Sequence, residues 1–120
     1  MRSSQLLKGA LELAVLLALD RRESYGLELV ERLRDAGLRD VADPSVYGVL
    51  RRLEKDGMLT ASLVPSTAGP ARKYYELSGA GREALAEANG EWARLVGAIE
   101  RLADRADRAD RADRTEGDPE

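Results

Sequence analysis

The segment from residue 43 to residue 57, DPSVYGVLRRLEKDG, predicts a short helix with two contrasting faces. Asp43 can cap its start, Pro44 suits the first helical position because its missing N–H would have no partner there, and Gly57 can end it. One narrow sector of the helical wheel holds the apolar residues Val46, Val49, Leu50 and Leu53. The opposite side holds Pro44, Tyr47, Gly48, Arg51 and Lys55, flanked by Ser45 and Arg52. Any fold of this chain must bury the first side and leave the aromatic and basic side in solvent.

Two more helices are predicted ahead of this segment. Residues 5–19 (QLLKGALELAVLLAL) are apolar on nearly all sides in their second half, so this helix should be the central and most buried one. Its exposed side carries Lys8 and Glu12, four residues apart, as a predicted ion pair. Ser24 offers an N-cap for a second helix, and Gly37 offers its C-terminal stop.

After Gly57 the apolar period changes from helical to alternating. Residues 58–64 (MLTASLV) and 72–78 (RKYYELS) predict two strands, and residues 65–71 (PSTAGPA) predict the turn between them. The alternation places Leu59, Ala61, Leu63, Tyr75 and Leu77 on the inward face and Tyr74 on the outward face. The result is a β-hairpin with two cations, Arg72 and Lys73, near its tip.

A long helix is predicted over residues 79–103. Its apolar residues recur at steps of three and four: Leu85, Ala88, Trp92, Leu95, Ile99 and Leu102. This stripe is too narrow and too long to be covered within so small a domain, so a partner helix is expected.

Residues 104–120 are predicted to form a separate charged tail. From Ala103 to Arg114 the triplet Ala-Asp-Arg repeats four times, and the Asp of each of the first three triplets meets an Arg four residues on, as Asp104 meets Arg108. With no apolar stripe to join a core, a frayed or disordered tail is expected. The expected boundaries are therefore a first domain over residues 1–78, the long helix over residues 79–103, and this tail.

The composition excludes several classes of function. The chain has no cysteine and no histidine, which removes disulfides, Ser-His or Cys-His catalysis and His/Cys metal sites. No spacing of carboxylates suggests a catalytic pair, so neither an enzyme nor a cofactor is expected. The longest early apolar run, residues 13–19, is far shorter than the about 20 residues that span a bilayer, and no cleavage site follows it. A cytoplasmic protein without a membrane partner is expected.

The net charge of −3 does not argue against nucleic acid once it is divided along the chain. Residues 1–60 balance ten Lys/Arg against ten Asp/Glu, residues 61–78 carry +1, residues 79–103 carry −1, and residues 104–120 carry −3. The excess of acidic residues lies in the tail. The clustering of charge, and not the total charge, therefore decides whether the chain can bind nucleic acid.

The predicted elements are three helices, the third with a basic exposed face, and then a two-stranded hairpin and another helix. This is the element order of a winged helix-turn-helix DNA-binding domain, which is expected over residues 1–78. The expected fold class is mainly α with a small β-hairpin. The residues also resemble the PadR family of bacterial transcriptional regulators. The matching segments run in order from residue 5 to about residue 103: LLKGALELAVLLAL, SYGLELVERL, PSVYGVLRRLEKDGML, GPARKYYELSGAGREAL and EWARLVGAIERL.

The resemblance implies a homodimer that binds a near-palindromic operator in double-stranded DNA and represses transcription. Its dimer would be joined by the last helix, which would also pack against the first helix of the partner. The single short last helix resembles the smaller subclass of the family. That likeness implies paired tryptophans around a cavity that holds flat apolar or aromatic effectors, with Trp92 and Val96 as the contacts. Plain dimer packing is the alternative for Trp92.

Seven residues are candidates for DNA contacts: Ser45, Tyr47, Gly48, Arg51, Arg52, Arg72 and Lys73. Tyr47 lies on the exposed side, where its hydroxyl could bond a phosphate, and Arg51 could reach a guanine or a phosphate. Arg52 stands beside Glu54 and Asp56, so solvated ion pairs are the alternative there. Gly48 departs from the family pattern, because many members have proline after the tyrosine.

A second hypothesis belongs to a different class of function. The chain could be a winged-helix protein-interaction module that recruits another protein through its last helix and does not read DNA. In that case the loss of Tyr47 and Arg51 would leave its function unchanged.

Overall fold

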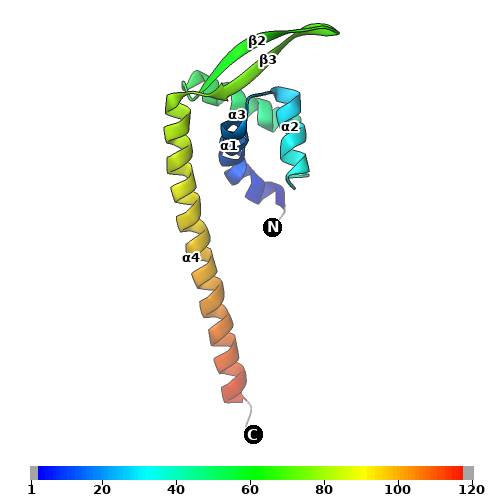
Figure 1. The fold of residues 1–120 in the computed structure, drawn as a ribbon. Coiled ribbons are helices and arrows are strands. Elements are labelled where there is room, and N and C mark those ends of the chain that lie inside the picture. Colours follow the sequence, from blue (N-terminus) through cyan, green and yellow to red (C-terminus); the bar gives the residue numbers. More distant parts are fainter. Residues whose placement is uncertain (1–2, 118–120) are drawn as a thin grey trace. The chain divides into compact units, whose positions relative to one another are not determined.

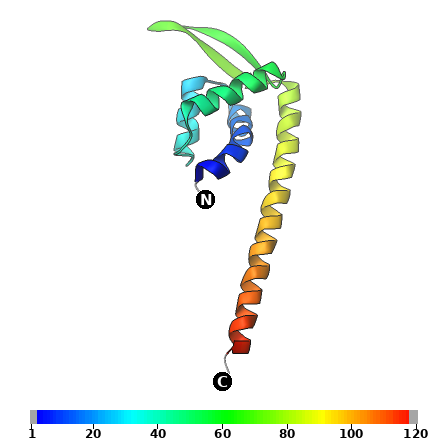
Figure 2. The same ribbon diagram turned by 180° about the vertical axis from the view of Figure 1, so that it is seen from behind.

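The computed structural model describes residues 3–117 of the 120-residue chain. The chain divides into a first unit that ends at Glu87 and a second unit that begins at Ala88, and each is considered by itself. The elements, shown from two opposite sides in Figures 1 and 2, are α1 (Ser3–Arg21), β1 (Ser24–Tyr25), α2 (Gly26–Asp35), α3 (Asp43–Lys55), β2 (Leu59–Ser66), β3 (Gly69–Leu77) and α4 (Gly79–Gly117). The predicted fold class, mainly α with a β-hairpin, is confirmed.

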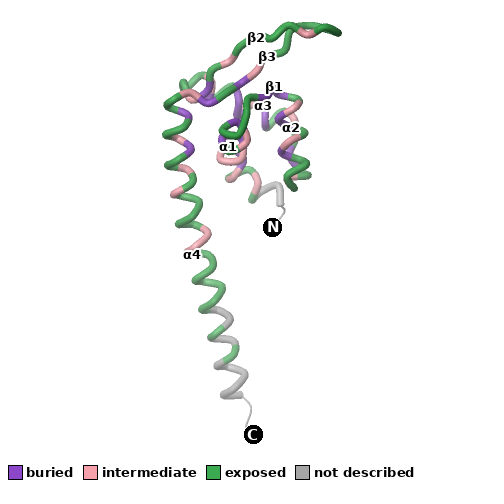
Figure 3. The backbone as a smooth tube through the Cα atoms, viewed as in Figure 1, coloured by how far each residue is buried: buried purple, intermediate pink, exposed green. Residues whose placement is uncertain are grey.

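The core of the first unit lies among α1, α2, α3 and the base of the sheet, where Figure 3 shows the buried segments. Val15 and Leu16 of α1 are almost completely enclosed, which confirms the central position predicted for the first helix. The apolar side predicted for α3 is buried as a set: Val46, Val49, Leu50 and Leu53. The other side of α3 is thereby turned to solvent.

The predicted stops of α2 and α3 are confirmed. Gly37 has φ +119° and Gly57 has φ +78°, a left-handed region in which glycine meets no steric penalty. After α3 the Met58 N–H turns back and donates to the Leu53 carbonyl over 2.8 Å, which satisfies an end carbonyl of the helix. The exit from α3 into the hairpin is therefore closely defined.

Two predicted helix caps are wrong, because arginines from α2 occupy the side-chain oxygens. Ser24 belongs to β1 and is fully buried, and its Oγ accepts a hydrogen bond from Arg32. α2 starts two residues later, at Gly26, without a side-chain cap. Asp43 lies inside α3, where its carboxylate accepts a hydrogen bond from Arg34 over 2.8 Å.

Arg32 ties three elements together beneath the sheet. Its guanidinium donates to the Ala18 carbonyl of α1 over 2.7 Å and to the Ser24 Oγ of β1 over 2.6 Å. Burial lowers the pKa of Arg32, and the neighbouring Arg22 lowers it further. The hydrogen bonds to Ala18 and Ser24 offset this desolvation and join α1, β1 and α2.

The variant Arg32→Met is expected to lower the free energy of unfolding by about 2 kcal/mol, because it leaves the buried Ser24 hydroxyl without its donor. Adding Ser24→Ala removes the orphaned hydroxyl and should recover part of that loss. Urea denaturation of the two variants and of the parent measures both effects. A double variant less stable than Arg32→Met would contradict this role for the pair.

β1 is a third strand that the sequence pattern did not predict, because two residues are too few to show a period. The strand order is β1-β3-β2, with both pairings antiparallel. β1 pairs with β3 through Ser24 with Tyr75 and Tyr25 with Tyr74. The start of α2 is therefore fixed directly to the hairpin.

The hairpin is longer than predicted and extends beyond the core. β2 continues to Ser66 and β3 begins at Gly69, so only two residues form the turn. Tyr75 is buried as predicted, but Leu63, predicted to face inward, is 71% exposed because no core lies beneath that part of the hairpin. Pro65 is tolerated because β2 is an edge strand and its register shifts at that point.

Ser78 joins the exit of α3 to the start of α4. Its Oγ accepts a hydrogen bond from the Gly81 N–H over 3.0 Å, as an N-cap does, and donates to the Gly57 carbonyl over 2.6 Å. The Ser78 N–H also donates to the Met58 carbonyl. One residue thus links the α3 exit, the hairpin and the first turn of α4.

The second unit is the remainder of α4. Its apolar side chains stay open to solvent in the single chain: Trp92 is 45% exposed, Leu95 52%, Ile99 55% and Leu102 62%. The helix predicted to end at residue 103 continues to Gly117, with Asp104 and Arg108 paired at 3.2 Å. Alanine and such pairs favour helix, which accounts for the extension. No helix in the described part of the chain has the length and apolar character needed to cross a membrane.

Candidate nucleic-acid interface

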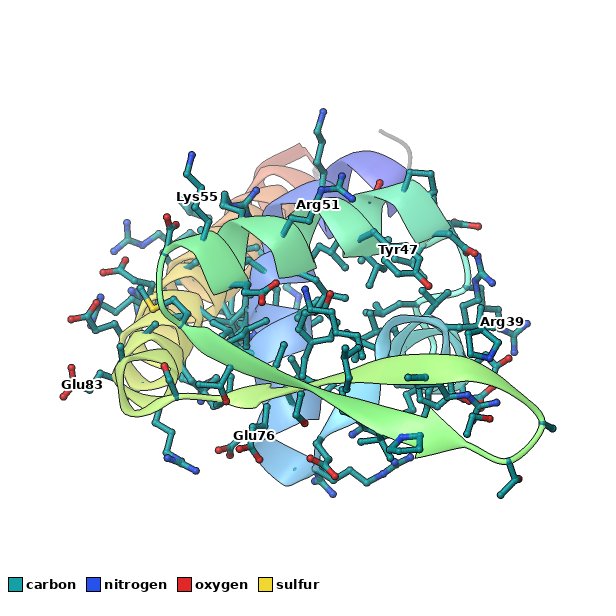
Figure 4. All side chains as sticks on the ribbon, turned by 90° about the horizontal axis from the view of Figure 1, so that it is seen from above. Arg39, Tyr47, Arg51, Lys55, Glu76 and Glu83 are labelled. Carbon is teal, nitrogen blue, oxygen red and sulfur yellow. The ribbon has the colours of Figure 1, made fainter. Side chains whose placement is uncertain are left out.

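The solvent side of α3 presents two cations. Arg51 and Lys55 are exposed, and neither has an ion-pair partner among the residues that the structure describes. Figure 4 shows both on the side of α3 that faces away from the hairpin. Ser45 is exposed near the start of the helix, and a Cβ at Gly48 would meet no atom within 4 Å. This face can approach an anionic surface closely.

Tyr47 does not stand free in solvent as the helical wheel predicted. Its ring is partly buried against the core and lies on Gly26 at the start of α2, where a Cβ would collide with it. Figure 4 shows the side chain between α3 and the hairpin. The wheel describes one helix alone, whereas here a glycine of the neighbouring helix leaves room for the ring.

Two of the predicted DNA-contacting cations are engaged in ion pairs. Arg52 donates to Glu12 of α1 over 2.9 Å. Arg52 is therefore not paired with Glu54 or Asp56, and Glu12 is not paired with Lys8, as the sequence had suggested. Lys73 donates to Glu54 of α3 over 2.9 Å, and this hydrogen bond raises the pKa of Lys73. Both pairs are exposed, so each cation can exchange its carboxylate for another anion at low cost.

Arg72 is held by aromatic rings. Its guanidinium carbon lies 4.5 Å from the centroid of the Tyr25 ring, within the range of a cation–π interaction. The Tyr25 ring in turn meets Tyr74 edge to face, with centroids 5.3 Å apart and planes at 69°. The structure therefore places Arg72 over Tyr25 and Lys73 near Glu54, and the two cations, though adjacent in sequence, have different partners.

Sequence reasoning missed Arg39 and Tyr25. Arg39 is exposed, has no ion-pair partner in the described residues, and lies toward the same end of the first unit as the hairpin tip (Figure 4). Its place in the short link directly before α3 was the signal that could have found it. No local pattern pointed to Tyr25, because its role depends on pairing with a strand far along the chain.

Trp92 and Val96, the predicted ligand contacts, lie one turn apart on α4 in the second unit. Trp92 is exposed and Val96 is half-buried in the single chain. Their position is compatible with contacts to a partner or a ligand.

The described residues contain no group of three or more His, Cys, Asp or Glu side chains that could hold a metal ion. The chemistry that the first unit offers is that of guanidinium, ammonium and hydroxyl donors on α3 and the hairpin. Such donors bind phosphates and base edges.

Comparisons with known proteins agree with this chemistry. Residues 15–87 match the transcriptional regulator PadR-like family. A Streptococcus transcriptional regulator is 37% identical, over 82% of this chain and 97% of its own, with a TM-score of 0.74. A PadR-like transcriptional regulator from Bacillus cereus is 34% identical, over 82% of this chain and 96% of its own, also with a TM-score of 0.74.

The fold is also similar to that of Bacillus subtilis PadR, whose structure was solved in complex with operator DNA. That protein is 20% identical, over 64% of this chain and 45% of its own, with a TM-score of 0.59, so the likeness is one of fold. The family match covers α2, α3 and the hairpin entirely, which are the elements that carry the exposed cations. The chain belongs to the PadR-like family of transcriptional regulators.

Proposed function

We propose that the chain is a homodimeric repressor that binds a near-palindromic operator in double-stranded DNA through α3 and the hairpin. The observation that carries the proposal is the exposed side of α3, where Arg51 and Lys55 have no partner in the described residues. A helix with such a face fits a major groove about 12 Å wide. The structure of Bacillus subtilis PadR with operator DNA supports the same use of this fold.

The candidate contacts fall into two kinds. Arg51 is proposed to reach a guanine or a phosphate, and Ser45 and Gly48 allow the helix to approach the groove. Arg52, Lys73 and the ring-held Arg72 are proposed to contact the backbone, which sets affinity more than sequence preference.

Dimerisation is proposed through α4. A single chain leaves Trp92, Leu95, Ile99 and Leu102 exposed along one stripe, and a second copy would cover them. Two copies are also what a near-palindromic operator requires, with half-sites one helical turn apart.

We expect the purified chain to sediment as a homodimer at micromolar concentration and to bind DNA from upstream of its own gene more tightly than scrambled DNA of equal length. Footprinting should show two half-sites whose centres lie about 34 to 36 Å apart. Both binding measurements need one stated salt concentration, because phosphate contacts depend on it. A stable single-chain species, or equal affinity for the two DNAs, would contradict the proposal.

Release of the repressor is proposed to follow binding of a flat apolar or aromatic compound near Trp92 and Val96 of the dimer. Trp92 is the one tryptophan of the chain, so its fluorescence reports on this site alone. We expect planar hydrophobic compounds to quench it and to weaken operator binding in the same order. Compounds that quench Trp92 without changing operator affinity would contradict release by this route, because such a ligand must bind the two states unequally.

A further inference from the structure

A hollow of about 350 Å³ lies in the first unit where α3, the start of α2 and β3 meet. Its wall includes Tyr47 from α3, Tyr25 from β1, Gly26 from the start of α2, and Arg72 and Lys73 from β3. The hollow opens where β1 ends, because β1 pairs with only two residues of β3 and leaves the rest of that edge without a strand. None of the residues that line it carries a carboxylate.

Arg72 is fixed at this hollow with its donors available. The guanidinium lies over the Tyr25 ring, with its carbon 4.5 Å from the ring centroid, and Tyr74 supports that ring edge to face. Arg72 makes no hydrogen bond or ion pair with the residues that the structure describes, so its N–H groups are available to a ligand. The cation is therefore held in place before any ligand arrives.

Tyr47 supplies a second donor. Its ring lies on Gly26, and its hydroxyl has no hydrogen bond to the residues that the structure describes. Lys73 adds positive charge at the wall, although its ammonium is already bonded to Glu54. The available donors at the hollow are thus one guanidinium and one phenolic hydroxyl.

A guanidinium and a phenolic hydroxyl line the same hollow, together with tyrosine rings and without a carboxylate among the lining residues. Such a lining suits an anion that has several acceptor oxygens and organic substituents, as a phosphodiester does. We propose that this hollow binds a single backbone phosphate of the operator, with Arg72 and Tyr47 as its donors and Tyr25 as the residue that positions Arg72. This inference rests on the proposed function, because it assigns one phosphate of the same DNA complex.

The test uses the full-length chain and operator duplexes in which one phosphate at a time is a neutral methylphosphonate. Arg72→Gln is expected to weaken binding to the unmodified operator roughly tenfold and to lower the slope of affinity against salt by about one. At one position in each half-site, the methylphosphonate should weaken binding of the parent to a similar degree and leave the affinity of Arg72→Gln unchanged. The loss of affinity that Tyr47→Phe causes with the unmodified operator should be absent with the duplex modified at that same position.

The positioning role of Tyr25 has its own test. Tyr25→Phe keeps the ring face and should bind the operator as the parent does. Tyr25→Leu should weaken binding, and it should have no further effect once Arg72→Gln is present. Thermal melting monitored by circular dichroism identifies any variant that loses affinity by unfolding. A loss with Tyr25→Leu that persists in the Arg72→Gln background would overturn the positioning role.

The other outcomes separate this inference from the function it rests on. If the parent binds its operator but no methylphosphonate position depends on both Arg72 and Tyr47, the phosphate assignment is wrong and the repressor proposal stands. If inorganic phosphate, titrated into the DNA-free protein, shifts the amide resonances around Gly26 while no DNA position depends on Arg72, the hollow binds free phosphate and the assignment to the operator is overturned. If the parent binds no DNA, both proposals fail.

Discussion

Gly81→Ala is expected to destabilise the first unit by about 3 kcal/mol, the upper end of the usual range for overpacking. A Cβ at this position would collide with the Met58 carbonyl oxygen and would lie 3.1 Å from the Met58 carbonyl carbon. Those atoms belong to the backbone and cannot rotate aside as a side chain would. For a unit of this size, such a loss corresponds to a fall in melting temperature of roughly 12 to 24 °C.

Gly79→Ala is the matched control for this variant. Gly79 begins the same helix, but a Cβ there would meet no atom within 4 Å. Because alanine favours helix over glycine, this variant should melt at or slightly above the parent temperature. Differential scanning calorimetry of both variants measures the contrast. Equal melting temperatures for Gly81→Ala and Gly79→Ala would show that the close approach of α4 to Met58 has no part in stability.

The position of Gly81 matters because the α3 exit and the α4 start share their hydrogen bonds. The Met58 carbonyl accepts from the Ser78 N–H, and the Ser78 Oγ bridges Gly57 and Gly81. A side chain at Gly81 would force these bonds apart. The sequence offered Ser78 as the residue before the last helix, but it did not reveal why a glycine must follow three residues later.

Local patterns predicted those parts of the fold that depend on local physics. The period of apolar residues located the three helices of the first unit, and Gly37 and Gly57 ended two of them because each adopts a positive φ. The alternation after Gly57 gave the hairpin and the buried side of Tyr75. In each case the residues of one short segment are sufficient to determine its conformation.

The features that were missed depend on residues far apart in the sequence. Ser24 looked like a cap because a serine before a helix usually is one, but Arg32 and a pairing with Tyr75 place it in a buried strand. Tyr47 looked exposed because no wheel includes the Gly26 of another helix. Such contacts follow from packing, which no local period describes.

Sequence alone could not rank the cations of the candidate site. Arg51 and Arg52 are neighbours on one helix, and both were predicted to contact DNA. The structure distinguishes them, because Arg52 bonds to Glu12, 40 residues away, whereas Arg51 has no partner in the described part of the chain. An unpaired cation gives up no internal bond when it meets an anion, so the two should differ in their contribution to DNA affinity.

Arg51→Gln is therefore expected to weaken operator binding by about 10-fold to 100-fold, the range for losing one good arginine contact to a base. The matched control is the double variant Glu12→Gln/Arg52→Gln, which removes the exposed ion pair and leaves the net charge unchanged. It should weaken binding by no more than about threefold. Arg52 must give up its bond to Glu12 before it contacts the backbone, and removal of the Glu12 carboxylate offsets the lost positive charge. Fluorescence anisotropy with labelled operator and with scrambled DNA measures the affinity of both variants at one salt concentration.

A guanine contact predicts that Arg51→Gln loses affinity mainly for the operator, whereas a phosphate contact predicts an equal loss for both DNAs. If the double variant weakens binding as much as Arg51→Gln does, the unpaired state of Arg51 does not determine which cation of α3 binds the DNA.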